Sequence, residues 1–164
     1  MRNLQREEVE NALKRHGNRI LHLAYSYLHN RADAEDVLQD TMVQLLRAAP
    51  AFENEEHEKA WLLRVAINLC KNRLKGPWHL WENLPEDYPA EGVPEDSLAL
   101  FQAVSTLPVK YREVVHLFYY EDATTAEIAA LLGRRENAVR TQLSRARDLL
   151  RDKLKGGSEF HGVL

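Results

Sequence analysis

The chain has 164 residues, of which 45% are hydrophobic and 29% are charged, and its formal net charge at pH 7 is −3. These values are typical of soluble globular proteins, and the length suits one domain or two small ones. No apolar run approaches the ~18 residues of a membrane span, and the N-terminus lacks a signal-peptide core. The single cysteine, Cys70, excludes an internal disulfide, is expected in the core, and suits a reducing cytoplasm.

Apolar spacing predicts three helices in the first part of the chain, and no strand-like alternation is present there. The first helix is expected over residues 4–28. The second is expected to begin with Asp33 as its N-cap and to run to Ala49, where Pro50 ends it. The third is expected over residues 59–75.

Polar residues of the second and third predicted helices gather on defined faces. Asp36, Gln39 and Asp40 share an exposed face because they are three or four residues apart. The third helix carries a basic and amide-bearing face with Asn72 beside it, formed by Arg64, Asn68, Lys71 and Lys75. Each face could be an ordinary solvated helix surface. Together they would suit a protein that holds a protein partner and nucleic acid.

Residues 76–104 differ in charge from the rest of the chain. They contain six acidic residues and no Lys or Arg, a net charge of −6. Four prolines in this segment block regular helix: Pro77, Pro85, Pro89 and Pro94. The segment is therefore predicted to be an acidic, extended linker between two small helical domains, and the fold class is all-α.

A helix-turn-helix is predicted near the C-terminus. Thr124 and Glu127 form a T-x-x-E capping box at the start of its first helix, and Gly133 suits the left-handed position that ends it. The second helix, over residues 136–154, is expected to bury a stripe formed by Val139, Leu143, Ala146 and Leu150.

The outer face of this second helix is basic. Arg140, Ser144, Arg147 and Arg151 recur along it, and residues 134–155 hold eight Lys or Arg against three acids, a local net charge of +5. A basic helical hairpin can be only a solvated surface. Because the whole chain is acidic, however, this concentration favours a helix that enters the DNA major groove.

Taken in order, these segments resemble RNA polymerase sigma factors of the extracytoplasmic-function type (group IV of the sigma-70 family), which keep only sigma regions 2 and 4. Residues 33–41 are similar to the family's D-A-E-D-hydrophobic-x-Q-[DE]-x stretch, and residues 60–69 to its A-W-L-x-R-[IV]-A-x-N-x helix. Residues 107–115 resemble the L-P-x-x-x-R opening of region 4, and residues 127–147 its helix-turn-helix. The resemblance covers roughly residues 9–154.

The resemblance implies a domain organisation. Region 2 would occupy residues 1–75, the acidic linker residues 76–104 and region 4 residues 105–155. The remaining residues, 156–164, are Gly-rich and expected to be a flexible tail.

The resemblance also implies partners and contact residues. The beta-prime clamp helices of core RNA polymerase would bind Asp36, Leu38, Gln39 and Asp40, and the beta flap would bind region 4. The −10 element of promoter DNA would meet Trp61, Arg64, Asn68, Lys71 and Asn72. The −35 element would be read or clamped by Arg140, Thr141, Ser144 and Arg145, with phosphate contacts from Arg134, Arg135, Arg147 and Arg151.

The family further implies a cytoplasmic bacterial protein that an anti-sigma factor can bind and hold at the membrane. No cofactor and no metal site is expected.

Two segments depart from the family's pattern. Arg134 and Arg135 stand in the turn where relatives often have an apolar residue followed by Ser or Thr, so the turn is expected to pack less securely. Residues 53–58, expected as the loop before the third helix, carry four carboxylates that would repel a DNA strand.

Two other classes of protein share parts of this sequence pattern. His57-Glu58 begins like the H-E-x-x-H motif of zinc enzymes, but Trp61 replaces the second ligand, so an enzyme is not expected. A helix-turn-helix regulator would share the C-terminal half but bind duplex DNA without polymerase, usually as a dimer. The segments at 33–41 and 60–69 favour the sigma factor, because a sensing domain has no reason to carry them.

Overall fold

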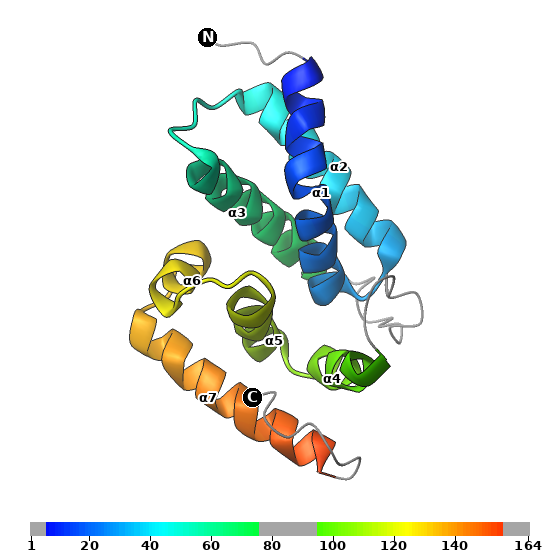
Figure 1. Ribbon diagram of the computed structural model, residues 1–164, viewed down its shortest axis with the longest axis vertical. Coiled ribbons are helices and arrows are strands. Elements are labelled where there is room, and N and C mark those ends of the chain that lie inside the picture. The colour runs from blue at the N-terminus through cyan, green and yellow to red at the C-terminus, as the bar shows by residue number, and fades with distance from the viewer. Residues whose placement is uncertain (1–5, 76–94, 156–164) are drawn as a thin grey trace. The chain divides into compact units, whose positions relative to one another are not determined.

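The computed structural model describes residues 6–75 and 95–155, and these residues form helices and no strand (Figure 1). The predicted all-α class is therefore confirmed. The chain divides into two compact units, Met1–Tyr88 and Pro89–Leu164. The predicted tail, residues 156–164, lies outside the described residues.

The N-terminal unit contains α1 (Arg6–Leu28), α2 (Arg31–Ala48) and α3 (Glu55–Leu74), and each of these helices contacts the other two. Their apolar faces meet in a core whose largest fully buried side chains are Ile20, Leu23, Tyr25, Val37, Leu62 and Ile67. Cys70 is also fully buried, as predicted. Burial of these faces holds the three helices together and leaves the polar faces of α2 and α3 outward.

The prediction that Asp33 is the N-cap of α2 is wrong. Asn30 is the N-cap, and its side chain accepts a hydrogen bond from the backbone N–H of Asp33 at 2.9 Å. Asn and Asp cap helices about equally well, and Asn30 stands where the chain turns after α1. Asp33 lies instead in the first turn, where its negative charge meets the positive end of the helix.

The predicted loop at residues 53–58 is also corrected, because α3 begins at Glu55 and not at residue 59. Asn54 caps the helix by accepting a hydrogen bond from the backbone N–H of His57 at 2.8 Å. Three of the four carboxylates therefore lie in the first turn of α3, where they stabilise the helix N-terminus: Glu55, Glu56 and Glu58.

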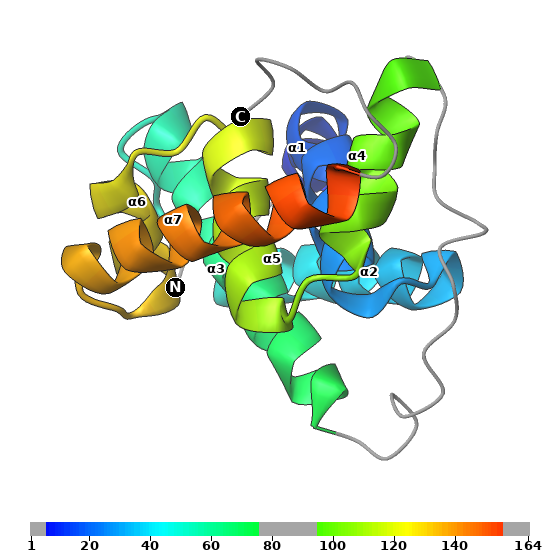
Figure 2. The same cartoon turned by 90° about the horizontal axis from the view of Figure 1, so that it is seen from below.

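The described part of the C-terminal unit contains five helical segments (Figure 2). They are α4 (Glu95–Ser105), α5 (Val109–Val115), the π-helical segment η2 (His116–Tyr120), α6 (Thr125–Leu132) and α7 (Glu136–Leu154). The long helix α7 contacts α4, α5 and α6. The predicted stripe of α7, Val139, Leu143, Ala146 and Leu150, is buried.

Helix α4 overturns the C-terminal part of the predicted linker. Ala103 and Val104 of this helix pack against a buried cluster formed by Leu107, Val115, Ala146 and Leu150. The prolines that argued against helix all lie at or before residue 94, so nothing prevents a helix from starting at Glu95. The rest of the predicted linker, residues 76–94, lies outside the described residues.

The L-P-x-x-x-R stretch closes the turn between α4 and α5. The guanidinium of Arg112 is buried, and its Nη1 donates to the backbone oxygen of Leu107 at 2.7 Å and to that of Ser105 at 3.3 Å. These bonds satisfy the carbonyl group of the last residue of α4 and one carbonyl group of the turn that follows it. Arg112 therefore supports the fold.

Candidate polymerase and promoter interfaces

The acidic residues of α2 form an exposed face, as their spacing predicted. Asp36, Gln39 and Asp40 are exposed, and Leu38 is half-buried beside them. The opposite side of the helix carries buried Val37 and Leu45 and packs into the core. The face is therefore held in place by a rigid helix and is accessible to a partner.

Arg73 of α3 is a residue of this face that the sequence reading missed. Its guanidinium lies 3.6 Å from Asp33, 3.9 Å from Asp36 and 3.8 Å from Asp40. One arginine thus partly neutralises three carboxylates and ties the acidic face of α2 to α3. The three acids, spaced over two turns of one helix, are the sequence signal for such a cation, but they do not say which helix supplies it.

The structure brings the predicted −10 residues together on α3. Arg64, Asn68 and Asn72 are exposed, and Lys71 is half-buried. Trp61 is half-buried too, with its ring centroid 5.8 Å from that of Phe52 in an edge arrangement. Its ring is therefore already engaged in an aromatic cluster at the start of α3.

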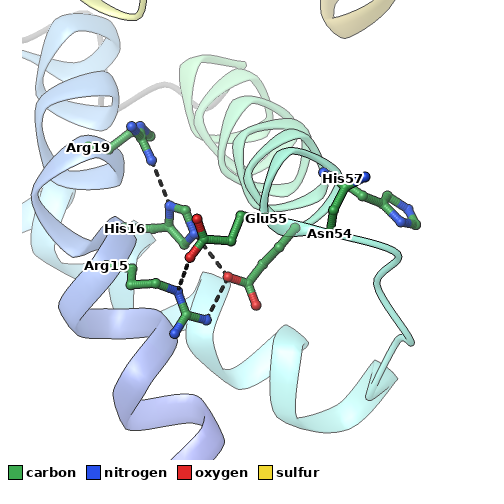
Figure 3. A network of polar contacts seen from close by, with 7 residues as sticks. Arg15, His16, Arg19, Asn54, Glu55 and His57 are labelled. Atoms are coloured by element: carbon green, nitrogen blue, oxygen red, sulfur yellow. Dashed lines mark hydrogen bonds and ion pairs between the residues drawn. The ribbon is translucent and has the colours of Figure 1, made fainter.

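The carboxylate of Glu58 joins the start of α3 to α1. Its Oε1 accepts from Nη2 of Arg15 at 2.7 Å and lies 3.0 Å from Nε2 of His16. Arg15 also pairs with Glu55 at 3.7 Å, and Figure 3 draws these contacts between α1 and the start of α3. Part of the acidic charge at residues 53–58 is thus compensated from α1, which reduces the repulsion that the sequence predicted for DNA.

His16 is neutral in this network. Nη1 of Arg19 lies 2.6 Å from Nδ1 of His16, and an arginine can only donate, so Nδ1 accepts and the proton sits on Nε2 (Figure 3). Burial lowers the pKa of His16, and the charge of Arg19 lowers it further, against the opposing effect of Glu58. The ring therefore acts as an uncharged bridge between α1 and α3.

The helix-turn-helix has the local geometry that its sequence predicted. The backbone N–H of Glu127 donates to Oγ1 of Thr124 at 3.1 Å, and the backbone N–H of Thr124 donates to Oε1 of Glu127 at 2.8 Å, which completes the capping box. Gly133 follows α6 with φ of 67°, the left-handed conformation that a glycine adopts without strain.

Arg134 and Arg135 have different environments although they are neighbours. Arg134 forms an ion pair with Glu113 of α5, and its Nη1 donates to Oε1 of Gln142 at 3.0 Å. Arg135 is exposed and is the N-cap of α7 without a side-chain capping bond. The turn is thus secured through Arg134, whose charge is used inside the fold, whereas Arg135 remains accessible.

The first half of α7 presents a compact polar face that includes four predicted −35 residues. Arg140, Thr141, Ser144 and Arg145 are all exposed. Nη2 of Arg140 lies 3.0 Å from Oε2 of Glu136. Residues in the first turns of a recognition helix are the ones that reach base edges in the major groove.

The second half of α7 holds its arginines differently. Nε of Arg147 donates to the hydroxyl of Tyr119 at 2.8 Å, and its guanidinium lies over the rings of Phe118 and Tyr119 at 5.6 and 5.8 Å. Arg151 pairs with Asp148 at 3.1 Å on the surface. The π-helical segment η2 thus supplies an aromatic support for Arg147, which the sequence reading did not anticipate.

Two further findings concern the described residues. No group of three or more His, Cys, Asp or Glu side chains is arranged to hold a metal ion within residues 6–75 and 95–155. None of the helices described is both long enough and apolar enough to span a membrane.

Sequence comparison matches the two units to two parts of one family. Residues 12–79 match the family model Sigma-70 region 2, and residues 97–150 match the model Sigma-70, region 4. The second match begins before residue 105 and includes most of α4, in agreement with the packing of that helix.

Individual relatives are sigma factors as well. The chain is 32% identical to the ECF RNA polymerase sigma factor SigE of Mycolicibacterium smegmatis, over 87% of this chain and 60% of that protein. It is 30% identical to the ECF RNA polymerase sigma factor SigM of Mycobacterium tuberculosis, over 87% of this chain and 74% of that protein. With the RNA polymerase sigma factor SigV of Bacillus subtilis it shares 29% identity, over 85% and 86% of the two chains.

Two solved structures with a similar fold are complexes with a second protein. CnrH, solved in complex with the cytosolic domain of CnrY, matches with a TM-score of 0.71 and 25% identity, over 94% of this chain and 92% of that one. The sigma factor RpoE of Bartonella quintana, solved with the anti-sigma factor NepR, matches in fold with a TM-score of 0.77 and 22% identity, over 91% and 98%. From the two region matches and these relatives, the chain belongs to the ECF RNA polymerase sigma factors of the sigma-70 family.

Proposed function

We propose that this chain is an alternative sigma factor that binds core RNA polymerase and directs it to promoters by recognising −10 and −35 elements. The observation that carries the proposal is that each of the two compact units has its own polar face, and that the two faces differ in charge. An acidic face lies on α2, within the region 2 match, and a basic face lies on α7, within the region 4 match. This combination suits a protein that bridges a protein partner and DNA.

The acidic face of α2 would bind the beta-prime clamp helices of the polymerase. Asp36, Gln39 and Asp40 offer charge and hydrogen bonds, and half-buried Leu38 offers apolar area at the edge of the face. Arg73 keeps the carboxylates of Asp36 and Asp40 near one guanidinium, which reduces their mutual repulsion. Complementary charge of this kind raises association rates and sets specificity.

The exposed face of α3 would hold the −10 element as single-stranded DNA. Asn68 and Asn72 carry amides that can both donate to and accept from a base edge, and Arg64 and Lys71 can neutralise phosphates. Trp61 stays a predicted stacking residue. Its contact with Phe52 supports a role in shaping the start of α3 at least as well.

The −35 element would lie against the first half of α7. Arg140, Thr141, Ser144 and Arg145 would meet base edges, with Arg135, Arg147 and Arg151 near phosphates. Arg134 is left out of this set, because its ion pair with Glu113 and its bond to Gln142 already use its charge inside the fold. The beta flap of the polymerase would bind the C-terminal unit.

The chain would act through binding alone, with no catalysed reaction, cofactor or metal, and it would work in the bacterial cytoplasm. The two similar structures, each solved with a partner protein, support an anti-sigma factor as a further partner, which could hold the chain at the membrane.

Transcription with purified components tests the proposal. Run-off transcription from a matched promoter should appear only when this chain and core polymerase are both present. Changing Gln39 and Asp40 together to Ala should reduce capture of core polymerase without changing the helical content. The double change of Glu10 and Asn11 to Ala is a matched control, because it removes one acid and one amide from the exposed surface of α1.

Two results would contradict the proposal. Tight, sequence-specific binding of the chain to duplex DNA in the absence of polymerase would favour an ordinary helix-turn-helix regulator. Equal capture of core polymerase by the α2 variant and its α1 control would place the polymerase contact on another surface.

A further inference from the structure

One carboxylate oxygen joins both helices of the helix-turn-helix to the face proposed to read DNA. Oε2 of Glu136 accepts a hydrogen bond from Oγ1 of Thr125 at 2.5 Å and another from Nη2 of Arg140 at 3.0 Å. Thr125 is the first residue of α6, and Glu136 is the first residue of α7. The contact therefore fixes the start of one helix to the start of the other and continues to an arginine of the DNA face.

The hydroxyl of Thr125 is available for this contact because its neighbour Thr124 caps α6. The side chain of Glu136 is 39% exposed and that of Arg140 is 62% exposed, so the pair lies at the surface. An exposed pair of this kind adds little to stability. We therefore expect the pair to act mainly on the orientation of the Arg140 guanidinium.

A carboxylate at this position is expected to weaken the binding of DNA. Glu136 is one turn from Arg140 on a helix proposed to enter the major groove, where phosphate groups repel negative charge. Arginine side chains have many rotamers, and a fixed carboxylate reduces that freedom before DNA binds. The bond uses one N–H of the guanidinium and leaves the others, so Arg140 can still make the bidentate contact with guanine O6 and N7.

We propose that Glu136 is a specificity-determining positioning residue. It holds the guanidinium of Arg140 in the orientation that reads a guanine of the −35 duplex, and it disfavours DNA that lacks this base. This inference rests on the proposed function, since it assigns a residue that acts through Arg140 within the same interface.

Substitution of Glu136 in the full chain, assembled with core polymerase, tests the inference. With a promoter library randomised in the −35 element, Glu136→Ala should lower the base preference at the position read by Arg140 about two- to fivefold, the range of an exposed ion pair. Binding to an unrelated duplex should rise, because a repulsive charge is gone. Glu136→Gln should retain part of the preference, because its amide oxygen can still accept both bonds.

Asp148→Ala is the matched control. It removes the same charge from the same helix and breaks a comparable exposed pair, that of Asp148 with Arg151 at 3.1 Å. It should raise binding to unrelated duplex to a similar degree and leave the base preference unchanged. Thr125→Val should shift the preference in the same direction as Glu136→Ala, because the carboxylate loses its anchor on α6.

A double variant shows whether Glu136 acts through Arg140. In an Arg140→Ala background, Glu136→Ala should change the base preference no further. Additive effects of the two changes, or identical library profiles for Glu136→Ala and Asp148→Ala, would overturn the inference while Arg140 keeps its proposed role. If the unaltered chain with polymerase shows no −35 preference at all, both the inference and the −35 part of the proposed function fail.

Discussion

Arg134 and Glu113 show at the residue scale how a charged side chain in a turn can hold a fold together. The side chain of Glu113 is only 1% exposed and that of Arg134 is 21% exposed. A buried carboxylate costs several kcal/mol unless a partner compensates it. Arg134 supplies that compensation because it reaches from the turn between α6 and α7 to α5.

Arg134→Ala should therefore destabilise the C-terminal unit strongly. The change removes the arginine of an ion pair whose carboxylate is buried, and truncating one member of such a pair typically costs about 3–5 kcal/mol of unfolding free energy. Urea unfolding followed by circular dichroism measures the loss. Arg135→Ala is the control, because Arg135 is exposed and its removal should change stability by no more than ~0.5 kcal/mol. Equal stability of the two variants would refute the structural role of Arg134.

His16 gives the N-terminal unit a defined dependence on pH. Because burial lowers the pKa of His16 below its ordinary value of 6.5, the unfolded chain binds a proton more readily than the folded one as the pH falls through this range. The contribution of His16 to stability is thus fully present above pH 6.5 and is lost as the pH falls toward its folded pKa. The slope from one such group is at most about 1.4 kcal/mol per pH unit.

Comparison with His16→Gln isolates this contribution. The variant should show a shallower loss of unfolding free energy as the pH falls below about 6.5, with the contribution of His22 retained. Burial also lowers the pKa of His22, so the variant keeps part of the dependence. Superimposable pH profiles of the two proteins would mean that His16 does not titrate differently in the folded and unfolded states.

At the scale of elements, the sequence predicted best those features that depend on a few neighbouring residues. The capping box of Thr124 and Glu127 and the left-handed Gly133 follow from residues within ten positions of one another. The starts of α2 and α3 were placed too late, because the apolar spacing begins after the caps, Asn30 and Asn54. A cap belongs to the turn that precedes the helix, so periodicity alone does not locate it.

Helix α4 was missed for a different reason. Its acidic first residues and the prolines before them resemble the linker, whereas its helical state depends on burial of Ala103 and Val104 against residues far along the chain. Tertiary packing of this kind decides whether a short segment is helical, because short isolated helices are marginal in water.

Val104→Asp should consequently lower the stability of the C-terminal unit. The charge would face the cluster that contains Leu107 and Leu150, and we expect a loss of about 1–2 kcal/mol for a half-buried position. The matched control is Gln102→Asp, an exposed position of the same helix that should be almost neutral. Thermal unfolding of both variants makes the comparison. If they melt together, α4 does not contribute to the core of this unit.

At the scale of the whole molecule, the sequence predicted which residues face outward but not what fixes them. Arg140 and Asn68 could be placed on exposed faces from helical spacing alone. The contacts that hold other exposed side chains could not be placed, because Arg73 of α3 reaches Asp40 of α2 and Tyr119 lies 28 positions from Arg147. Such contacts depend on how the helices pack against one another. The spacing of residues along the sequence does not specify that packing.

The two faces proposed to contact DNA lie in different compact units, and this division leads to a prediction for the assembled polymerase. Asn68→Ala should weaken promoter binding through the −10 element and Arg140→Ala through the −35 element, each by about 1–3 kcal/mol. Since the two residues lie in different compact units, we expect the losses to add in the double variant, so that the two fold-changes in the dissociation constant multiply.

The test is the dissociation constant of the holoenzyme for one promoter at fixed salt. It is measured with the unaltered chain, with each single variant and with the double variant. Capture of core polymerase without DNA should be equal for all four, since neither change touches the acidic face of α2. A double variant that binds no more weakly than Arg140→Ala would show that the −10 face contributes only after the −35 contact is made. The two units would then act in sequence, and Asn68 would be a residue of promoter opening whose effect appears in transcription and not in the initial binding.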